Sequence, residues 1–312
     1  MTSHPELAII LVNWNRSDDT LNCLESISAS AYRSFVVIVV DNGSTSEELL
    51  KLRQTKWNFV LLETGENLGY TGGNNRGIEH ALQLGADYVL LLNNDTFIAT
   101  DTLGNMMRAA LADPKIGILT PKIFFHPDRH LIWSAGTSLD RRFMIGYLTG
   151  YKDSDRGQFD EPRDLEYASG CAMLIRNNVL RDVGLLCDDY FAVCEDIDYC
   201  FRAAKKGYRI RYEPSAAVWH IESASSGGHD GPQYVYYQLR NYFLLHARWA
   251  ESSSQLMLSQ AFLLLYAVKR AFLLGMRGKW RSLLGIVYGI RDATIGKLGR
   301  RDYKVLAKRT SV

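Results

Sequence analysis

The sequence has few of the features that would assign it to several common protein classes. Its five cysteines are an odd number and include no C-x-x-C pair, which argues against a disulfide framework and against zinc. The opening segment MTSHPELAII has no basic stretch and no cleavage site, so it predicts a first strand rather than a signal peptide. The longest uncharged run, Ser252 to Val268, is shorter than the roughly 20 apolar residues that cross a bilayer. We therefore expect reduced thiols and a cytoplasmic protein.

Net charge is small overall, but charge is unevenly distributed along the chain. The 312 residues carry a net charge of +2 and are 47% hydrophobic, which is ordinary for a globular protein. From Gln255 to Val312 there are 12 Lys and Arg residues against 2 Asp and Glu, whereas the remainder holds 24 basic and 32 acidic residues. A basic, apolar C-terminal segment behind an acidic body indicates contact with an anionic partner, although a solubilising tail would have the same charge.

Apolar runs alternate with helical patterns in the first half of the chain. Strands are predicted at 7–13, 35–41, 58–63, 88–93 and 116–120, and helices near 18–30, 46–55, 73–84 and 101–112. Asp101 is placed to cap the last of these helices, and Gly85 is placed to end the third. Alternation with short connections predicts an α/β fold, a doubly wound and mostly parallel sheet with helices on both faces.

Polar residues follow these apolar runs at the point where each predicted strand ends. Asn13 ends the first run, Asp41 ends the second, and Asn93, Asn94 and Asp95 follow the fourth. Open α/β sheets bind their ligands just outside the carboxyl ends of the strands. Amide and carboxylate groups at that edge suit a sugar nucleotide and its metal ion better than a bare phosphate.

The pattern changes after Pro121. Residues 122–165 lack helical periodicity and predict loops and short antiparallel strands. Further on we expect a strand over 166–176, a helix over 195–207, a strand over 208–220, a Gly- and Ser-rich loop over 223–232 and a helix over 233–250. This predicts a catalytic domain over 1–232, with a nucleotide-binding half (1–120) and an acceptor half (121–232), followed by a basic helical region over 233–312.

Seven short motifs occur in one order between residues 7 and 220, roughly two thirds of the chain. They are VNWN (12–15), DNGS (41–44), ENLGYTGGNNRG (66–77), LNNDT (92–96), SGCA (169–172), EDIDYCFR (195–202) and WH (219–220). Together they resemble the family 2 glycosyltransferases of the GT-A fold, in the bacterial rhamnosyltransferase-like branch. The C-terminal third of the chain is not covered by this resemblance.

The resemblance implies a nucleotide site. In the family, the position of Asp41 accepts a hydrogen bond from the pyrimidine N3–H, although this carboxylate would also suit a cap for the helix after Ser44. The other residues implied in nucleotide or donor binding are Asn13, Asn67, Gly69, Asn74, Arg76, Asn93 and Asn94. For Asn74 and its neighbour Asn75, ordinary helix capping is the alternative. The Gly-rich run argues against a dinucleotide fingerprint, because it follows the third strand and lacks the G-x-G-x-x-G spacing.

The resemblance also implies a metal site. Asn93-Asn94-Asp95 stands where the family carries D-x-D, so that Asp95 is the remaining carboxylate ligand, with a helix cap before Asp101 as the alternative. Mg²⁺ takes one or two carboxylates plus phosphate oxygens and waters, so one Asp is enough if the diphosphate supplies the rest. His220 matches a position that completes the metal site and would favour Mn²⁺, with a structural histidine at a strand end as the alternative.

Asp196 matches the family's general base. A carboxylate there would take a proton from the acceptor hydroxyl, and Glu195 beside it would raise the pKa of Asp196. Acids at a helix start also suit the helix dipole, which is the alternative interpretation. Asp198 and Arg202 are four residues apart and are expected to pair. Glu195 and the small residues Ser169 and Gly170, expected at a strand end, are assigned to the acceptor side. For the small residues, tight packing near the sheet is the alternative.

Taken together, these features predict a metal-dependent inverting glycosyltransferase. By resemblance, its donor is a dTDP- or UDP-sugar, plausibly of rhamnose, and its acceptor is a glycan or lipid-linked glycan of the cell surface. The Leu- and Phe-rich basic segment predicts amphipathic helices on an anionic membrane surface, at the inner face of the cell membrane, rather than nucleic-acid binding; helices docked on the protein's own core are the alternative. A sugar nucleotidyltransferase or a non-catalytic nucleotide-sugar or polysaccharide binding protein are the competing functions.

Overall fold

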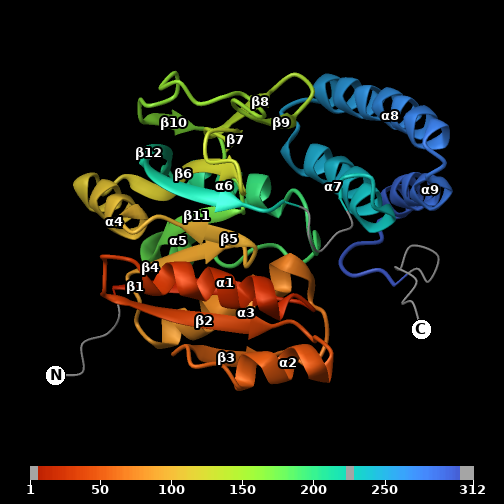
Figure 1. Cartoon of the computed structure of the whole chain (residues 1–312). Helices are drawn as coiled ribbons and strands as arrows, with labels where there is room; N and C mark the ends of the chain where they lie inside the picture. The colour runs from red at the N-terminus through yellow and green to blue at the C-terminus, as the bar shows by residue number, and fades with distance from the viewer. Residues whose placement is uncertain (1–5, 223–227, 303–312) are drawn as a thin grey trace. The chain divides into compact units, whose positions relative to one another are not determined.

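The computed structural model describes residues 6–222 and 228–302 (Figure 1). The chain divides into two compact units. The first, here called the sheet unit, comprises 1–138, 147–186 and 196–222. The second, the helical unit, comprises 139–146, 187–195 and 223–312, so two short segments from the middle of the chain belong with the C-terminal helices. Residues 223–227 of the predicted loop 223–232 lie outside the described residues.

The first half of the sheet unit is a parallel sheet with its strands in the order β4-β1-β2-β3. In β1 (Leu7–Asn13), Leu7 pairs with Phe35 of the next strand and Asn13 pairs with Asp41, so these strands end together. The predicted bounds of the first two strands are confirmed. The other elements of this half are β2 (Phe35–Asp41), β3 (Val60–Glu63), β4 (Tyr88–Leu92), α1 (Ser17–Ser28), α2 (Ser46–Arg53) and α3 (Gly69–Gln83).

Helices cover both faces of this parallel sheet, as predicted. Ile9 and its neighbours at odd positions of β1 pack in a core with Leu24 and Ile27 of α1. Ile10, at an even position, faces α3 instead, where a Cβ on Gly77 would lie 2.5 Å from its side chain. Both faces of a strand are therefore apolar, which is why the strands are continuous runs of Val, Ile and Leu.

The second half of the sheet unit is mixed. β11 (Ala172–Arg176) lies antiparallel between β4 and β6 (Ile116–Phe125), while β6 and β12 (Arg209–His220) are parallel. The strand predicted over 116–120 is therefore separated from the parallel strands. The remaining elements here are β5 (Thr96–Ile98), β7 (Ile132–Ser134), β10 (Arg163–Leu165), α4 (Thr102–Ala112), α5 (Asn177–Val183) and α6 (Glu195–Lys205). Short antiparallel strands in 122–165 were predicted and are confirmed.

Three local expectations concern the ends of helices. Gly85 has φ +78° just after α3 and ends it as predicted. Asp101 stands at the N-cap position of α4 but caps no backbone N–H, and its carboxylate instead accepts a hydrogen bond from Asn105. The helix expected from residue 73 begins at Gly69, so Asn74 and Asn75 lie inside it and are not caps.

The helical unit is built from α7 (Pro232–Trp249), α8 (Ser253–Met276) and α9 (Trp280–Thr294). Val235 and Leu239 of α7 form a small apolar core with Leu263 of α8 and Ile286 of α9. Close packing of α7 on α9 requires small residues, since a Cβ on Gly285 would lie 2.5 Å from the Pro232 carbonyl. The strands β8 (Thr137–Asp140) and β9 (Ile145–Leu148) form a separate two-stranded sheet whose tip belongs to this unit.

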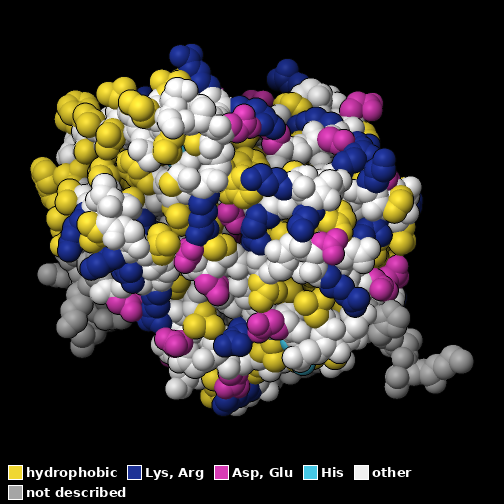
Figure 2. All heavy atoms as spheres, turned by 180° about the vertical axis from the view of Figure 1, so that it is seen from behind, with side chains coloured by type: hydrophobic (Ala, Val, Ile, Leu, Met, Phe, Trp, Pro, Cys, Tyr) yellow, Lys and Arg dark blue, Asp and Glu magenta, His cyan; other side chains and the backbone are white. Residues whose placement is uncertain are grey.

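One face of α8 exposes large apolar side chains. Hydrophobic atoms gather in one region of the molecular surface at the upper left of Figure 2. Among the described residues, α8 is long and apolar enough to cross a membrane by length and composition, and only 17% of its most apolar window is buried. The uncharged run from Ser252 to Val268 was expected to be too short to cross a bilayer. That expectation is corrected, because the helix continues through Lys269 and Arg270 and is still apolar enough over its length.

Candidate functional site

The carboxyl ends of the parallel strands bring several predicted residues to one edge of the sheet. Asn13, at the end of β1, donates from Nδ2 to Asp41 Oδ1 at 3.0 Å and to Ser44 Oγ at 3.1 Å. The Ser44 backbone N–H donates to Asp41 Oδ2 at 3.1 Å. Asp41 is only 2% exposed, and each of its oxygens keeps one further lone pair. The helix cap of α2 is supplied by Thr45, so capping does not account for this carboxylate.

Asn67 and Gly69 shape the turn that follows β3. Asn67 Oδ1 accepts from the Gly69 N–H at 2.8 Å, and Asn42 Oδ1 accepts from the Leu68 N–H at 3.0 Å. Gly43 has φ +73°, and a Cβ there would lie 2.5 Å from the Glu66 carbonyl carbon. The two strand-end turns therefore approach each other more closely than side chains would allow, which explains the glycine.

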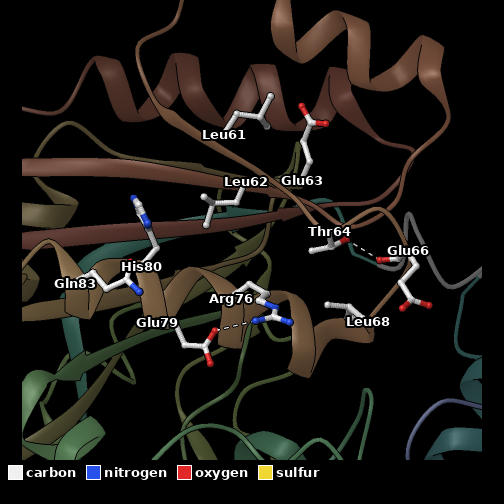
Figure 3. A pocket seen from close by; sticks show the side chains of 10 residues that line it. All are labelled: Leu61, Leu62, Glu63, Thr64, Glu66, Leu68, Arg76, Glu79, His80 and Gln83. Carbon is white, nitrogen blue, oxygen red and sulfur yellow. Dashed lines mark hydrogen bonds and ion pairs between the residues drawn. The ribbon is translucent and has the colours of Figure 1, made fainter.

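Asn74 and Arg76 lie one turn further along α3. Asn74 is buried and donates to the Tyr70 carbonyl at 2.9 Å, within the helix itself. Arg76 is exposed and pairs with Glu79 at 3.3 Å. It lines a cavity of about 490 Å³ between β3 and α3, drawn in Figure 3, together with Glu66 and Leu68 of the preceding turn. No hydrogen bond within the described residues joins either side chain to Asp41.

The Asn93-Asn94-Asp95 segment continues the polar edge beyond β4. Asn94 Nδ2 donates to Thr20 Oγ1 at 2.9 Å, and Thr20 Oγ1 donates to Asn13 Oδ1 at 2.9 Å. A chain of hydrogen bonds therefore links the end of β4 to the end of β1. The Asn93 N–H donates to the Cys171 carbonyl at 2.9 Å, which ties the segment to the residue before β11.

Asp95 and His220 meet at this edge. Asp95 Oδ1 lies 3.1 Å from His220 Nε2, although the two residues are 125 positions apart. Their side chains are 11% and 6% exposed. Burial disfavours the charged imidazole, but the neighbouring Cys171 and Asp95 side chains outweigh this effect and raise the pKa of His220 well above its ordinary value.

A divalent cation fits this pair of donors in chemical type. A carboxylate oxygen and an imidazole nitrogen suit Mn²⁺, and an oxygen-rich set suits Mg²⁺. Among the described residues there is no cluster of three or more His, Cys, Asp or Glu side chains that would hold a metal by itself. His220 Nδ1 is buried without a hydrogen-bond partner in the described part of the chain. Two protein ligands would leave most coordination positions to a diphosphate and water.

Asp196 stands at the start of α6. Its Oδ2 accepts from the Gly170 N–H at 3.0 Å, and its Oδ1 accepts from the Ile197 N–H at 2.9 Å. Burial raises the pKa of Asp196, and these two N–H groups oppose that rise only in part. A carboxylate with a raised pKa is a better proton acceptor than an ordinary one, as a general base requires.

The small residues Ser169 and Gly170 precede β11 rather than end a strand, which corrects that expectation. Because β11 runs antiparallel to β4, with Ala172 opposite Leu92, its beginning lies at the edge where β4 ends. Ser169 is buried, and its Oγ accepts from the Cys171 N–H at 3.3 Å. Ser169 and Gly170 therefore lie at the same edge as the ends of the parallel strands, because they precede an antiparallel strand.

The predicted pair of Asp198 and Arg202 is confirmed at 2.9 Å. Arg202 also donates to the carbonyls of Val183 and Leu185, at 3.0 and 2.9 Å, and so fixes the segment after α5. Asp198 therefore acts on the structure around the site. Glu195 opens α6 and is buried.

Sequence reasoning missed two residues of this edge, Thr20 and Tyr70, and placed Asn42 at a strand end without giving it a role of its own. Asn42 holds the turn after β3, Thr20 links two strand ends, and Tyr70 donates to the Gly170 carbonyl at 2.5 Å. Asn42 and Tyr70 stand inside the motifs DNGS and ENLGYTGGNNRG, which was the available signal. Thr20 had none, because its hydroxyl meets Asn94 only through the fold.

The fold and this edge define an α/β protein whose polar side chains gather at the carboxyl ends of its parallel strands, where such sheets bind ligands. Residues 8–184 match the model of the family described as Glycosyl transferase family 2, and the chain belongs to that family. The rhamnosyltransferase-like resemblance is confirmed by the relatives described next.

Among curated relatives, the low-salt glycan biosynthesis hexosyltransferase Agl10 of Haloferax volcanii is 28% identical over 77% of this chain and 75% of its own. The N-acetylglucosaminyl-diphospho-decaprenol L-rhamnosyltransferase of Mycobacterium tuberculosis is 28% identical over 78% of this chain and 86% of its own.

Solved structures are similar in fold. A structure of GalNAc-T7 with UDP, GalNAc and Mn²⁺ has a TM-score of 0.64 at 14% identity; it is covered over 49% of its length, and this chain over 81%. The mannosyltransferase PcManGT of Pyrobaculum calidifontis with GDP-Man and Mn²⁺ has a TM-score of 0.57 at 17% identity, covering 97% of this chain and 78% of that one.

Proposed function

We propose that this glycosyltransferase moves a sugar from a pyrimidine nucleoside diphosphate to an acceptor hydroxyl with inversion, in a reaction that depends on a divalent cation. The observation that carries the proposal is the placing of Asp95, His220 and Asp196 around one short segment. Cys171 accepts from the Asn93 N–H, and Gly170 donates to Asp196, so consecutive residues hold the metal side and the base side of the site.

The donor nucleotide would occupy the edge formed by Asn13, Asp41, Asn67 and Gly69. Asp41 would accept the base N3–H, and its remaining lone pairs are the feature that supports this role. A buried polar group left unmatched costs about 1–3 kcal/mol, so a nucleotide without that N–H would bind less well. Asn93 and Asn94 would contact the diphosphate or sugar, and Asn74 and Arg76 would act from the second turn of α3.

The cation would be held by Asp95 Oδ1 and His220 Nε2. When bound, it supplies Lewis-acid stabilisation of the charge on the leaving nucleoside diphosphate. Asp196 takes the proton of the acceptor hydroxyl as that oxygen bonds to the anomeric carbon and the bond to the diphosphate breaks. A single base without a positioned nucleophile favours one displacement and therefore inversion.

The acceptor is proposed to be a lipid-linked saccharide and the donor sugar rhamnose, because the mycobacterial relative carries both in its name. Ser169, Gly170 and Glu195 would lie on the acceptor side. The exposed apolar face of α8 and α9, together with their Lys and Arg residues, would hold the enzyme on an anionic membrane at the cytoplasmic face. Among its members are Leu265, Phe272 and Met276, with 71%, 67% and 75% of their surface exposed.

The test is a screen of nucleotide sugars for transfer and hydrolysis, each with Mn²⁺, with Mg²⁺ and with EDTA. We expect turnover of one pyrimidine nucleotide sugar, lost in EDTA and restored by Mn²⁺. Formation of a nucleotide sugar from a sugar phosphate would instead show a nucleotidyltransferase. Binding without any turnover, across donors and lipid-linked acceptors, would show a binding protein and overturn the proposal.

A further inference from the structure

The segment before Asp196 has an unusual backbone. Phe191, Val193 and Cys194 all have positive φ, at 63°, 74° and 73°. Such angles are uncommon outside glycine, and for a β-branched residue like Val193 they are strained. A strained segment persists only where its surroundings impose it. Other residues of the helical unit, to which 187–195 belongs, must therefore hold this segment in place.

Arg240 and Asn241, adjacent residues of α7, hold this segment through its backbone carbonyls. Arg240 Nη2 donates to the carbonyls of Asp189 and Tyr190, each at 2.8 Å. Asn241 Nδ2 lies 3.0 Å from the Tyr190 carbonyl, 2.6 Å from that of Ala192 and 2.7 Å from that of Val193. Both side chains are fully buried. Two neighbouring residues thus grip four carbonyls along five consecutive positions, 189–193.

The grip is reinforced on both sides of the guanidinium. Arg240 Nε donates to Asn241 Oδ1 at 2.8 Å, and Nη1 donates to the Gly299 carbonyl at 2.5 Å. The Gly299 N–H in turn donates to the Asp189 carbonyl at 2.8 Å. Phe191 stacks on Tyr237, with ring centroids 4.9 Å apart. The segment is therefore fixed by backbone bonds and by packing at once.

A simple connection between α5 and α6 would not require two fully buried polar side chains bonded to its backbone. A buried guanidinium is costly unless its donors are satisfied, and within the described residues Arg240 meets neutral oxygens rather than a carboxylate. Arg240 and Asn241 donate their hydrogen bonds to a segment that is followed directly by Glu195 and Asp196. A cost of this kind is usual where a backbone conformation serves a site.

We infer that Arg240 and Asn241 are positioning residues that hold 189–194 in the conformation that leads into Glu195 and Asp196 at the start of α6. The inference rests on the proposed function of Asp196 as the base. It assigns to the C-terminal helices a part in the reaction that is separate from membrane binding. Misplacing a reacting group by about 1 Å can cost on the order of 100-fold in rate, while a donor bound elsewhere is unaffected.

The test is Asn241→Asp in the full-length enzyme. This change keeps the shape and the acceptor for Arg240 Nε but removes the donors to Tyr190, Ala192 and Val193. We expect kcat to fall about 10- to 100-fold, with donor affinity, measured by calorimetric titration, changed less than about twofold. Arg240→Lys should lower kcat by a smaller factor, because lysine keeps the positive charge and some of the hydrogen-bond donors.

Two controls separate positioning from general loss of structure. Ser282→Ala removes a buried hydrogen bond to the Asp230 carbonyl elsewhere in the helical unit, and Arg248→Gln removes the ion pair with the Asp189 side chain. Both should keep kcat near the wild-type value, with thermal unfolding reporting any common loss of stability. Equal loss of kcat in Ser282→Ala, or loss of donor affinity in parallel with kcat in Asn241→Asp, would overturn the inference.

Asp196→Asn, measured in the same assay, distinguishes the two proposals. If Asp196→Asn is inactive and Asn241→Asp has the wild-type kcat, the positioning role is wrong and the base assignment stands. If Asp196→Asn keeps the wild-type rate, the base assignment itself is wrong, and the positioning role falls with it.

Discussion

The sheet unit and the helical unit differ in how far they bury their apolar residues. In the sheet unit, apolar strands are covered on both faces, and the polar groups gather at one edge, where Asp41 and Asp95 are nearly buried. In the helical unit, α8 leaves Phe272 and Met276 mostly exposed. Contiguous exposed apolar surface of this kind marks an interaction site. The residues proposed for metal binding and proton transfer, Asp95, His220 and Asp196, belong to the sheet unit, whereas the exposed apolar face belongs to the helical unit. Variants of the two regions can therefore be compared.

The largest expected effect is on the metal side of the sheet unit. Asp95→Ala should abolish transfer, because the carboxylate is one of only two proposed ligands, while thermal unfolding changes little. Excess EDTA should do the same to the wild-type enzyme. Asp101→Ala, a nearby acid outside the site, is the control and should stay active. Full turnover in EDTA would eliminate the metal role.

Asp196→Asn should lower kcat by at least about two orders of magnitude with little change in donor affinity, since general-base catalysis is worth about 10²–10⁴-fold. Because its pKa is raised, wild-type kcat/KM should fall as pH drops through a value above the ordinary 3.8 of an aspartate. Glu195→Gln should cost less, and Asp198→Asn should act through stability by losing Arg202. If Glu195→Gln were inactive and Asp196→Asn were active, the general base would be Glu195 rather than Asp196.

In the helical unit, we expect the buried side chain of His246 to make the stability of the protein depend on pH. His246 of α7 is fully buried, and burial lowers the pKa of His246 to about 4. The unfolded chain then takes up a proton that the folded chain does not, so stability is lost as pH falls from about 6.5 toward 4, by up to roughly 3 kcal/mol. Thermal melts across this range should show His246→Phe to be less pH-sensitive than wild type. The exposed His130→Gln variant should follow wild type; an unchanged pH dependence in His246→Phe would contradict the assignment.

A smaller effect is expected for base recognition at Asp41. Asp41→Ala should weaken dTDP and UDP binding about tenfold, in line with the roughly 1–3 kcal/mol cost of an unmatched polar group, and should bring GDP binding closer to theirs. Calorimetric titration with the three nucleotides measures this. Ser44→Ala, which removes a local hydrogen-bond partner of Asn13, is the matched control. Equal affinities and preferences in Asp41→Ala and wild type would leave Asp41 a purely structural residue.

The smallest effect is expected for membrane binding by the exposed apolar face of α8, which should change without any change in transfer. Phe272→Ser with Met276→Ser should reduce co-sedimentation with anionic vesicles by about tenfold, since burying such side chains is worth about 1.5–3 kcal/mol each and only part of that is realised in a membrane surface. Transfer to a water-soluble acceptor should not change. Leu111→Ser, which removes an exposed leucine of α4, is the control. Equal sedimentation of the double variant and wild type would show that this face does not bind membrane.

Local patterns predicted the elements of the parallel half well and those of the mixed half less well. The bounds of β1 and β2 follow from runs of Val, Ile and Leu that end in Asn13 and Asp41. The start of α3 was placed four residues late, because Gly69 and its neighbouring glycines resemble a loop. Gly73 and Gly77 must be small because α3 lies on Val12 and Ile10 there, a reason that no local pattern contains.

The candidate site was predictable where a residue follows its own strand. Asp41, Asn93 and Asp95 all lie at the edge that the alternation of strands and helices predicted. Ser169 and Gly170 were expected after a strand and instead precede one, because the antiparallel direction of β11 depends on its pairing with β4 and β6. Pairing direction is decided by neighbours far along the chain.

By itself, the sequence determined the family, the order of the strands along the chain and the polar residues that end them, because these depend on side-chain type and short spacing. The resemblance had already paired His220 with Asp95, and the structure adds the 3.1 Å distance between their side chains. Tertiary structure alone decided that Asp196 is held by Gly170, and that Arg240 and Asn241 hold the segment before it. Each of these contacts joins residues distant in sequence, so only the packing of the whole chain brings their atoms within bonding distance.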